Sequence, residues 1–343
     1  MSTALPSELE ALREDWDRLA TASGNVFLTW EFAAAWWRHF GAGREPAFGV
    51  VRQDGQVAAL VPLHRGGSAV RTLRFVGGGV ADQVGAVCAP ADLPVAGGEL
   101  RSMLHDVPHD LFLGDRLAGE ESWPALLGAA PAVHEASPVL EIETSDWDEF
   151  LAARSSNFRQ QAGKFERRLL RDHDLRYRLT SDHDGLERDL NLVFELHAKR
   201  WGEGATEFQL EPARSFHRDF AHAALDRGWL RLWIAELNGR PAAAWYGFRF
   251  GDSDWSYQTG RDPAFDHQSV GWVLTVHAVR EAVNDGMRAY RFLLGEEPYK
   301  ARFATADHGL DSFVIPRTAR GRAGHFAQRV RGRLARWASV RRG

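Results

Sequence analysis

The segment LWIAELNGRPAAAWYGF, residues 232–248, decides how the second half of the chain folds. Runs rich in aliphatic and aromatic residues lie on both sides of Asn238 and Gly239. These two residue types readily adopt the positive φ angles of a two-residue type I′ turn, and such a turn between two strand-forming runs is a strong signal for a β-hairpin. We therefore expect a pair of antiparallel strands here.

A second segment of the same kind, FGVVRQDGQVAALVPLH at residues 48–64, predicts another hairpin in the first half. Its turn is Asp54-Gly55, and Gly55 lies 184 residues before Gly239 (239 minus 55). One more strand-like segment follows each hairpin. This repeated order favours two similar halves, although hairpins are also common in unrelated α+β domains.

Helical and strand patterns continue through the second half of the chain. Apolar residues at helical spacing predict helices, and runs of β-forming residues predict the strands between them. The predicted helices cover residues 158–171, 186–201, 212–227 and 269–285. The predicted strands cover residues 229–237, 241–250, 254–260 and 289–294, followed by a short helix and a last strand at 311–316. This is the order of an α+β domain.

Composition limits the class of protein. A length of 343 residues suggests two domains, and 44% apolar with 26% charged residues is typical of globular chains. No run approaches the roughly 18 apolar residues of a membrane span, and the acidic start of the chain does not resemble a secretory signal. Cys88 is the only cysteine, which excludes an internal disulfide or a zinc site of several thiolates and fits a reducing compartment. We expect a cytoplasmic protein.

The C-terminal residues differ in charge from the rest of the chain. Residues 317–343 contain nine arginines and no carboxylate, so the other 316 residues carry 33 basic against 46 acidic groups, or −13. Five apolar residues in this region are spaced as on one helical face: Phe326, Val330, Leu334, Trp337 and Val340. We expect residues 319–343 to form a basic amphipathic helix. It would dock on the acidic body or make peripheral contact with the inner face of a membrane, whereas nucleic acid is a less favoured partner.

Two segments carry a family resemblance. YQTGRDPAFDHQSVGWVL at residues 257–274 and FLLGEEPYKARF at residues 292–303 resemble the acetyltransferase-like family associated with bacterial cellulose and exopolysaccharide synthesis, which is related to the Fem peptidyltransferases. The resemblance implies tandem GNAT-like domains, each a mostly antiparallel twisted sheet flanked by helices. The expected division is an N-terminal GNAT-like domain at 1–136, a C-terminal acyltransferase domain at 137–318 and the tail at 319–343.

The resemblance implies a cofactor site at the start of the helix predicted at 269–285. In a GNAT fold the backbone N–H groups at this helix start bind the CoA pyrophosphate, because they lack partners and the helix dipole favours an anion. The superfamily pattern Gln/Arg-x-x-Gly-x-Gly/Ala is met at its first two fixed positions, whereas Val273 is bulkier than the third requires. The implied cofactor-binding residues are Gln268, Ser269, Val270, Gly271 and Trp272. The alternative is an ordinary helix with Ser269 as its N-cap.

The segment GEEPYK, residues 295–300, follows an apolar strand and brings acid, phenol and amine together. Acyl transfer needs a base that takes a proton from the nucleophile and a donor that stabilises the leaving thiolate. In a GNAT sheet the fourth and fifth strands splay apart, and polar residues at the end of the fifth face the reacting carbonyl. The implied catalytic candidates are Glu296, Glu297, Tyr299 and Lys300. The alternative is a helix that starts at Pro298, with Glu297 as its cap and Tyr299 packed on Phe303.

Four residues are candidates for binding the acceptor: His197, Arg200, Trp201 and Tyr257. Aromatic rings and arginine can bind a sugar or peptide through stacking and hydrogen bonds. His197 lies in the apolar stripe of its helix, which favours a hydrogen-bonded core histidine, and helix packing explains Trp201 equally well. The glycine-rich stretch VGGGVADQVG at residues 76–85 is interpreted as a loop.

The predicted function is transfer of an acyl group from acetyl-CoA or another acyl-CoA, used as co-substrate and without a metal, to an amine or hydroxyl. The acceptor implied by the resemblance is a small molecule or glycan of the cell envelope or exopolysaccharide. Two alternatives stay open. One is a non-catalytic GNAT-fold partner in a polysaccharide or envelope assembly, and the other is a Fem-like peptidyltransferase that uses aminoacyl-tRNA.

Overall fold

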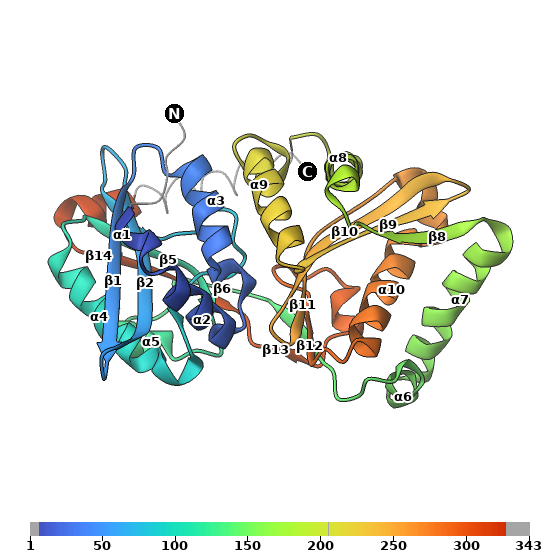
Figure 1. The fold of residues 1–343 in the computed structure, drawn as a ribbon, viewed down its shortest axis with the longest axis horizontal. Helices are drawn as coiled ribbons and strands as arrows, with labels where there is room; N and C mark the ends of the chain where they lie inside the picture. Colours follow the sequence, from blue (N-terminus) through green and yellow to red (C-terminus); the bar gives the residue numbers. More distant parts are fainter. Residues whose placement is uncertain (1–6, 205, 327–343) are drawn as a thin grey trace.

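The computed structural model describes residues 7–204 and 206–326 and contains two seven-stranded sheets, each flanked by helices (Figure 1). The first sheet lies on the left in Figure 1 and the second on the right. In each sheet one strand pair is parallel, β3 with β5 and β11 with β12, and the other described pairs are antiparallel. The predicted mixed α/β architecture of two mostly antiparallel sheets is confirmed.

The first sheet has the strand order β1-β2-β3-β5-β14-β6, with β4 paired to β2. Its hairpin turns at Asp54 and Gly55 with φ angles of 50° and 82°, as the sequence predicts. Its strands are β1 (Glu45–Gln53), β2 (Gln56–Gly66), β3 (Thr72–Phe75), β4 (Val87–Cys88), β5 (Leu111–Ala118), β6 (Val133–Glu135) and β14 (Leu310–Pro316). The helices of this half are α1 (Ser7–Glu10), α2 (Arg13–Ser23), η1 (Val26–Leu28), α3 (Trp30–Phe40), η2 (Pro90–Asp92), α4 (Leu93–Asp106) and α5 (Trp123–Leu127).

The second sheet has the order β13-β7-β12-β11-β10-β9-β8. Its hairpin turns at Asn238 and Gly239 with φ angles of 52° and 75°. Its strands are β7 (Pro138–Glu141), β8 (Leu175–Leu179), β9 (Leu230–Leu237), β10 (Arg240–Phe250), β11 (Ser253–Arg261), β12 (Ala289–Arg291) and β13 (Ala306–Asp307). The helices are α6 (Trp147–Ala153), α7 (Ser156–Asp172), α8 (His183–Trp201), η3 (Glu207–Gln209), α9 (Ala213–Asp226), η4 (Pro263–Gln268), α10 (Val270–Asn284) and η5 (Lys300–Arg302). No helix within the described ranges could cross a membrane, since none is both long and apolar enough.

The chain exchanges strands between the two sheets. After β6 it crosses to the second sheet as β7, and after β13 it returns as β14, between β5 and β6 of the first sheet. Residues 310–316 therefore belong to the first sheet, although the expected second domain extends to residue 318. The physical reason is that β14 pairs with β5 along almost its whole length and so covers an edge that would otherwise be open.

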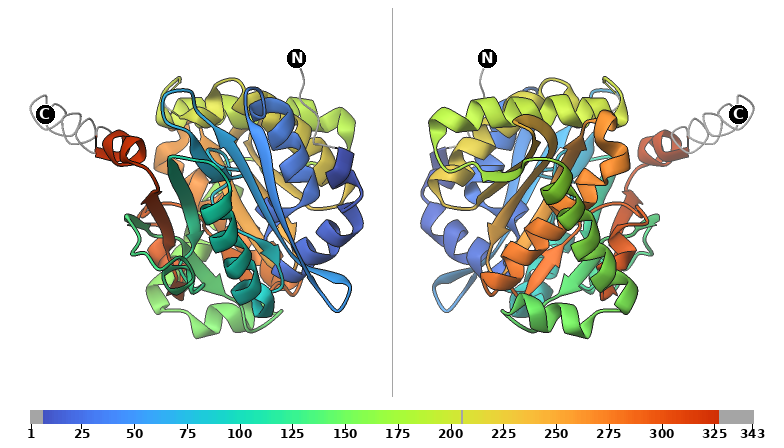
Figure 2. Two further views of the ribbon diagram at one scale, coloured as in Figure 1. Left: turned by 90° about the vertical axis from the view of Figure 1, so that its left-hand side faces the viewer. Right: turned by 90° about the vertical axis from the view of Figure 1, so that its right-hand side faces the viewer.

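Two hydrophobic cores hold the layers together. One extends from α4, on one face of the first sheet, to α8 and α9 on the inner face of the second sheet. The other lies between the outer face of the second sheet and α6, α7 and α10 (Figure 2). In the middle of the molecule α3 faces α9, where Phe32 lies 5.0 Å from Phe216 and 4.9 Å from Phe220 between ring centroids. Because the first core crosses the boundary between the sheets, the two halves should unfold together.

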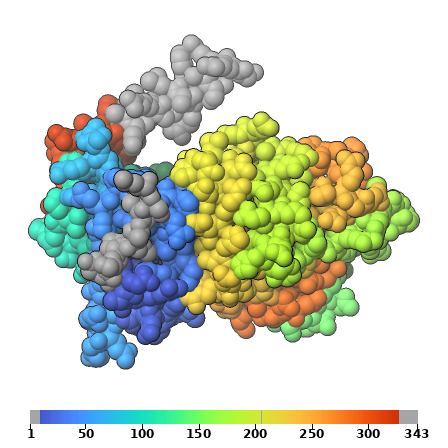
Figure 3. Space-filling model, turned by 45° about the horizontal axis from the view of Figure 1, so that its top comes forward, coloured from blue at the N-terminus to red at the C-terminus, as the bar shows by residue number. Residues whose placement is uncertain are grey.

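The described part of the tail is a helix over residues 319–326 that packs on the first half (Figure 3). Just before it, the Thr318 hydroxyl donates a hydrogen bond of 2.9 Å to Oδ1 of Asp110. Gly321 is buried so closely against Asp110 that a Cβ there would collide with the backbone carbonyl. Phe326, the first residue of the predicted stripe, is 69% exposed. The rest of the stripe lies outside the described residues: Val330, Leu334, Trp337 and Val340.

Phe313 tests the strand exchange. Its side chain lies in β14, is 0% exposed and belongs to the core that both sheets share. Phe313→Ala should lower the free energy of unfolding by about 3–5 kcal/mol, measured as a single urea transition by tryptophan fluorescence. Phe326→Ala, at a side chain that is 69% exposed, should change it by less than about 0.5 kcal/mol. A Phe313→Ala protein as stable as its parent, or one whose halves unfold separately, would contradict the shared core.

Candidate active site

The second sheet opens where its two parallel strands part. β11 and β12 pair over three residues only, from Ser253 opposite Ala289 to Trp255 opposite Arg291. β11 continues to Arg261, whereas β12 ends at Arg291. Two cavities lie at this opening, one beside α10 and one facing the first half. We call them the α10 pocket and the inner pocket.

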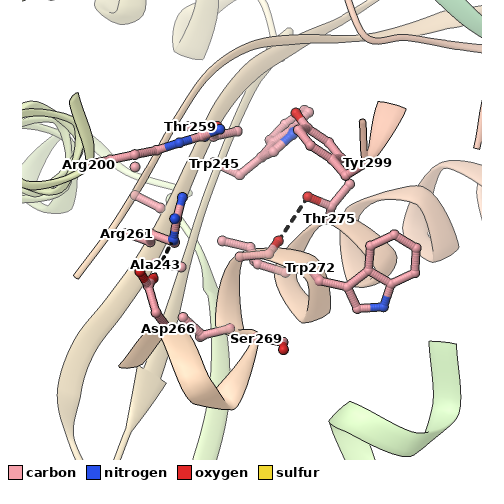
Figure 4. A pocket seen from close by; sticks show the side chains of 15 residues that line it. Arg200, Ala243, Trp245, Thr259, Arg261, Asp266, Ser269, Trp272, Thr275 and Tyr299 are labelled. Carbon is pink, nitrogen blue, oxygen red and sulfur yellow. Dashed lines mark hydrogen bonds and ion pairs between the residues drawn. The ribbon is translucent and has the colours of Figure 1, made fainter. Parts of the chain in front are cut away.

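The α10 pocket has a volume of about 150 Å³ and lies between the start of α10 and strands β10 and β11 (Figure 4). Arg200 enters it from the end of α8, and Arg261 enters it from the end of β11. The Nε atom of Arg261 donates to Oδ1 of Asp266 at 2.6 Å, which holds the guanidinium beside the start of the helix. The pocket therefore combines apolar walls with two arginines, one of which is paired with the Asp266 carboxylate.

The start of α10 has no side-chain cap. Ser269 precedes the helix in the left-handed conformation, with φ of 57°, and its hydroxyl caps none of the helix N–H groups. Ser269 therefore occupies the N-cap position, as the alternative expects, but its side chain does not cap the helix. A Cβ at Gly271 would meet only Cδ of Arg261 within 4 Å, at 3.4 Å, so the first turn is open to the pocket. Such a turn can accept an anion on its backbone N–H groups.

The remaining residues predicted to bind the cofactor take different positions. Val270 is fully buried and lines the α10 pocket from its floor. Trp272 also lines it, but its indole extends away from Arg200 and Arg261 (Figure 4). Gln268 does not line the pocket, and its Oε1 is buried with no partner in the described part of the chain. The structure thus places four of the five predicted residues in the pocket lining, whereas Gln268 is not part of it.

The inner pocket has a volume of about 130 Å³ and faces the first half of the molecule. It shares Thr259 and Tyr299 with the α10 pocket, so these two side chains border both cavities. Glu297 and Lys300 line it from the second half, and Asp82 lines it from the first. Two carboxylates, the phenols of Tyr257 and Tyr299 and an ammonium group therefore surround one small space.

An ion pair lies at the end of the splayed strand. The Nζ atom of Lys300 lies 2.9 Å from Oε2 of Glu297 and donates to the carbonyl oxygen of Leu294 at 2.6 Å. Lys300 is only 4% exposed, and these two partners satisfy its buried ammonium group. Gly295 has φ of 119°, and a Cβ there would collide with Oε2 of Glu297. A glycine at this position therefore allows the Glu297 carboxylate to lie directly against the backbone at the end of the strand.

The chain turns sharply after β12. Leu293 is buried with φ of 56°, a conformation that residues with a Cβ rarely adopt. The strand predicted at 289–294 consequently ends at Arg291. The N–H of Lys300 donates to the carbonyl of Glu297 at 2.9 Å, and no side chain caps η5. The alternative of a helix capped by the Glu297 side chain is therefore wrong.

Tyr299 and Glu296 have different surroundings. Burial, together with nearby Glu297, raises the pKa of Tyr299 to about 12, although Arg200 opposes the shift. The phenol therefore keeps its proton at neutral pH and can donate it. Glu296 is exposed and lines neither pocket, so the structure does not bring it to the site as predicted.

The first half supplies a carboxylate that the sequence analysis missed. Asp82 belongs to the loop at residues 76–85, and its Oδ1 lies 3.3 Å from Nη1 of Arg116. Burial raises the pKa of Asp82, although Arg116 and a hydrogen bond from the Leu294 backbone oppose the shift. The feature of the sequence that could have indicated Asp82 as a site residue is its position in a glycine-rich, apolar stretch. Only the fold shows that this loop reaches the second sheet.

Tyr257 connects the second sheet to the same loop. It is the extra residue of a β-bulge in β11, opposite the step between Tyr246 and Gly247. Its hydroxyl donates to the carbonyl oxygen of Val80 at 2.6 Å, and its side chain lines the inner pocket. The predicted acceptor residue Tyr257 is thus part of the cavity wall and fixes the loop that carries Asp82.

The other predicted acceptor residues divide into two groups. Arg200 donates to the Thr259 hydroxyl, and its guanidinium lies 4.5 Å from the centroid of Trp201, which is 45% exposed beside the inner pocket. His197 is 1% exposed, lines neither pocket and contacts Nε2 of Gln209 at 2.9 Å. Burial lowers the pKa of His197 to about 4. It is a neutral core histidine, and its predicted role in acceptor binding is not supported.

A second buried histidine lies behind Tyr257. The ring of His217 is 5.3 Å from Tyr257 and 5.9 Å from Tyr246 between centroids. Neither ring nitrogen has a hydrogen-bond partner among the described residues, and the residue is 1% exposed. Burial lowers its pKa to about 3, so the ring is neutral over the working range of pH.

The two pockets together provide an anion-binding helix start, a proton donor and paired charges around one opening. This set of groups suits acyl transfer to a nucleophile. Within residues 7–204 and 206–326, no group of three or more His, Cys, Asp or Glu side chains is arranged to hold a metal ion.

Comparison with known families agrees with this geometry. Residues 156–301 match the family model described as "Acetyltransferase (GNAT) domain". The matched region includes the start of α10 and the ion pair of Glu297 with Lys300. This part of the second half is therefore similar in sequence to GNAT acetyltransferase domains. No curated protein matches the chain.

Solved structures extend the similarity over both halves. FemX is 10% identical with a TM-score of 0.61, and the match covers 89% of this chain and 96% of that chain. L-PGS from Bacillus licheniformis is 11% identical with a TM-score of 0.55, covering 97% and 98%. A tandem GNAT protein from the clavulanic acid biosynthesis pathway is 13% identical with a TM-score of 0.50, covering 92% and 98%. At these identities the similarity shows the fold alone, which this chain shares with all three proteins.

His217 predicts how stability depends on pH. Its pKa is about 3 in the folded protein, against the ordinary histidine value of 6.5 in the unfolded chain, so between these values only the unfolded chain binds a proton. The stability that depends on the neutral ring is present above pH 6.5 and is lost as the pH falls. His217→Phe should reduce the slope of unfolding free energy against pH by about 1.4 kcal/mol per pH unit in this window, measured by urea denaturation.

A matched histidine on the surface provides the control. His267→Gln, at an exposed position, is this control, because it removes a histidine without removing a buried ring. An unchanged slope in His217→Phe would mean that the buried ring is protonated in the folded protein.

Proposed function

We propose that the protein is an acyl-CoA-dependent N- or O-acyltransferase acting on a small-molecule or glycan acceptor of the cell envelope or exopolysaccharide. The observation that carries this proposal is that Thr259 and Tyr299 border both the α10 pocket and the inner pocket. One pocket has a helix start suited to a phosphate, and the other has carboxylates and an ammonium group. A donor and an acceptor can therefore reach the same opening from different sides.

The α10 pocket suits the donor. The first-turn N–H groups and the positive end of the helix dipole favour the pyrophosphate of CoA. Arg261, held by Asp266 at 2.6 Å, places further N–H donors beside this turn. Gly271 leaves room for the phosphate, because only Arg261 lies within 4 Å of where its Cβ would be. Bound acyl-CoA supplies the activated thioester carbonyl and a thiolate leaving group.

The inner pocket suits the proton transfers. Glu297 is the proposed general base for the acceptor amine or hydroxyl, and Asp82, whose pKa is raised by burial, is a second carboxylate in the same space. The Tyr299 hydroxyl lies on the wall common to both pockets and keeps its proton, since its pKa is about 12. It is the proposed proton donor. The Lys300 ammonium group lines the same pocket and is proposed to stabilise negative charge on the reacting group.

The class of acceptor rests on two further features. The inner pocket is small, at about 130 Å³, and is lined largely by polar side chains, which suits a single sugar or amine-bearing group better than a long apolar chain. Trp201 is 45% exposed at its edge and offers a surface on which a sugar ring can stack. The resemblance of residues 257–274 and 292–303 to an exopolysaccharide-associated family supports the same class.

One observation favours a second candidate, Fem-like transfer from aminoacyl-tRNA. α7 exposes a basic stripe that contains Lys164, Arg167 and Arg171. The next arginine on this helix, Arg168, donates to the carbonyl of His267 at 2.7 Å, so the stripe lies beside the start of α10. A polyanion larger than CoA would use such a stripe, and its binding would weaken with salt.

Gly271→Leu tests the donor site. The new side chain would project at the start of α10 and fill the space proposed for the pyrophosphate. Leu favours a helix over Gly by roughly 0.5–1 kcal/mol, so the fold should be retained. Isothermal titration with acetyl-CoA should show an affinity at least about tenfold weaker than that of the wild type, since charge-assisted hydrogen bonds are lost.

Gly98→Leu is the matched control. Gly98 is a helical glycine of α4 with no atom within 4 Å of its Cβ position, so the same change should leave acetyl-CoA binding intact. Equal affinity in Gly271→Leu and wild type, with native circular dichroism, would overturn the donor site. If the wild type binds aminoacyl-tRNA and no acyl-CoA, the second candidate replaces the first.

Glu297→Gln tests the proposed base against an adjacent control. The change keeps the size of the side chain and removes its proton-accepting carboxylate, so turnover should fall by roughly 10²-fold or more while acetyl-CoA binding persists. Glu296→Gln, at the exposed neighbouring position, should retain full turnover. Thiol release from acetyl-CoA in the presence of a panel of amino sugars provides the assay.

The same assay separates the two carboxylates. If Glu297→Gln and Glu296→Gln turn over equally, Glu297 is not the base. Loss of turnover in Asp82→Asn alone would assign that role to the carboxylate from the first half.

A further inference from the structure

A cavity in the first half lies apart from both pockets of the acyl-transfer site. It has a volume of about 330 Å³ and lies between the α3–β1 connection, the end of β2 and the start of β3. Arg44, His64, Thr72 and Arg74 line it, together with three glycines and an alanine. None of these residues lines the α10 pocket or the inner pocket. We call it the arginine pocket.

The fold brings these side chains together from three segments. His64 of β2 and Arg74 of β3 are directly opposite each other in an antiparallel pair, so their side chains project from the same face of the sheet. Trp36 of α3 covers this face, with its ring centroid 4.8 Å from that of His64 and 5.5 Å from the guanidinium carbon of Arg44. Arg44 also donates to the carbonyl of Phe40 at the end of α3. The cluster is therefore held in place by packing.

The charge in the arginine pocket is unbalanced. Two guanidinium groups and no carboxylate line it. Burial and the charge of Arg74 lower the pKa of Arg44, and burial with both arginines lowers the pKa of His64 to about 3. Asp115 lies 2.9 Å from Nη2 of Arg74 but is not part of the pocket wall, so it offsets one cation only. Like charges held this close favour a bound anion.

Two polar atoms of the pocket residues have hydrogen-bonding capacity to spare. His64 is 3% exposed, and its Nδ1 is buried with no partner in the described ranges. The Nε atom of Arg74 is buried and has no partner there either. Buried polar groups in folded proteins are nearly always paired, so two such atoms in one cationic pocket point to a ligand that accepts hydrogen bonds.

We propose that the arginine pocket binds a phosphate-class anion, as a phosphomonoester, with Arg44, Arg74 and His64 as its ligands. Donors that converge from three segments suit a tetrahedral oxyanion, and each guanidinium fork pairs well with two phosphate oxygens. The volume of about 330 Å³ leaves room for the organic part of the ester. The same chemistry is offered by a soluble phosphorylated metabolite and by the headgroup of an anionic lipid. The proposal does not depend on acyl transfer in the other half.

Inorganic phosphate is the probe, and the full-length protein is the sample. Isothermal titration at constant ionic strength should show phosphate binding that weakens at least about tenfold in Arg44→Gln and in Arg74→Gln, because each variant loses charge-assisted hydrogen bonds. Arg52→Gln is the matched control. Arg52 is exposed at the far end of β1, and its replacement changes the net charge by the same amount, so phosphate binding should equal that of the wild type.

Vesicles that contain phosphatidic acid distinguish the two sources of the phosphate group. Sedimentation of the wild type and Arg52→Gln but not of Arg44→Gln would support the pocket with a lipid headgroup as its ligand. A second outcome would support the pocket with a soluble phosphomonoester as its ligand. In this case phosphate binding depends on Arg44, whereas the three proteins sediment with the vesicles equally or do not sediment at all. The proposal is overturned if the wild type does not bind phosphate, or if natively folded Arg44→Gln binds it as tightly as Arg52→Gln.

Discussion

The opening between β11 and β12 is the feature on which the candidate site depends. The two strands pair over three residues, and the chain then leaves the sheet because Leu293 and Gly295 take positive φ angles of 56° and 119°. Had the strands stayed paired, backbone hydrogen bonds would fill the opening at which the two pockets lie. The strain at Leu293 is therefore coupled to the position of the Glu297–Lys300 ion pair, which closes the end of the opening. The irregular backbone at Leu293 and Gly295 therefore creates the opening in an otherwise continuous sheet.

The first half completes this site instead of serving as a separate unit. Its loop at residues 76–85 reaches the opening with Asp82 and is held there by the hydrogen bond from Tyr257 to Val80, 2.6 Å long. The last described strand, β14, returns from the second sheet to the first, and one hydrophobic core extends through both. A carboxylate of the inner pocket therefore depends on packing between the halves. The first half therefore contributes a residue to the candidate site, although the GNAT family match covers only residues 156–301 of the second half.

Local patterns in the sequence predicted the elements well, and non-local contacts account for what they missed. Both hairpins follow from the turn residues, and the helix predicted at 269–285 is α10 at Val270–Asn284, because apolar periodicity and turn chemistry are local properties. The sheet to which β14 belongs could not be predicted, since an apolar strand pattern does not identify its partner. The role of Asp82 was hidden for the same reason. Glu296 was grouped with the ion pair by proximity in sequence, whereas the turn after β12 leaves it exposed.

Amide hydrogen exchange of the full-length protein, with and without saturating acetyl-CoA, tests the central claim most directly. Binding at the opening predicts slower exchange at residues 270–272, where the first turn of α10 would donate to the pyrophosphate. It also predicts slower exchange at residues 256–259 along the unpaired edge of β11. Exchange around the arginine pocket should stay unchanged. Protection confined to the first half of the chain, or none at either segment under conditions where acetyl-CoA is bound, would contradict the assignment of this opening as the acyl-CoA site.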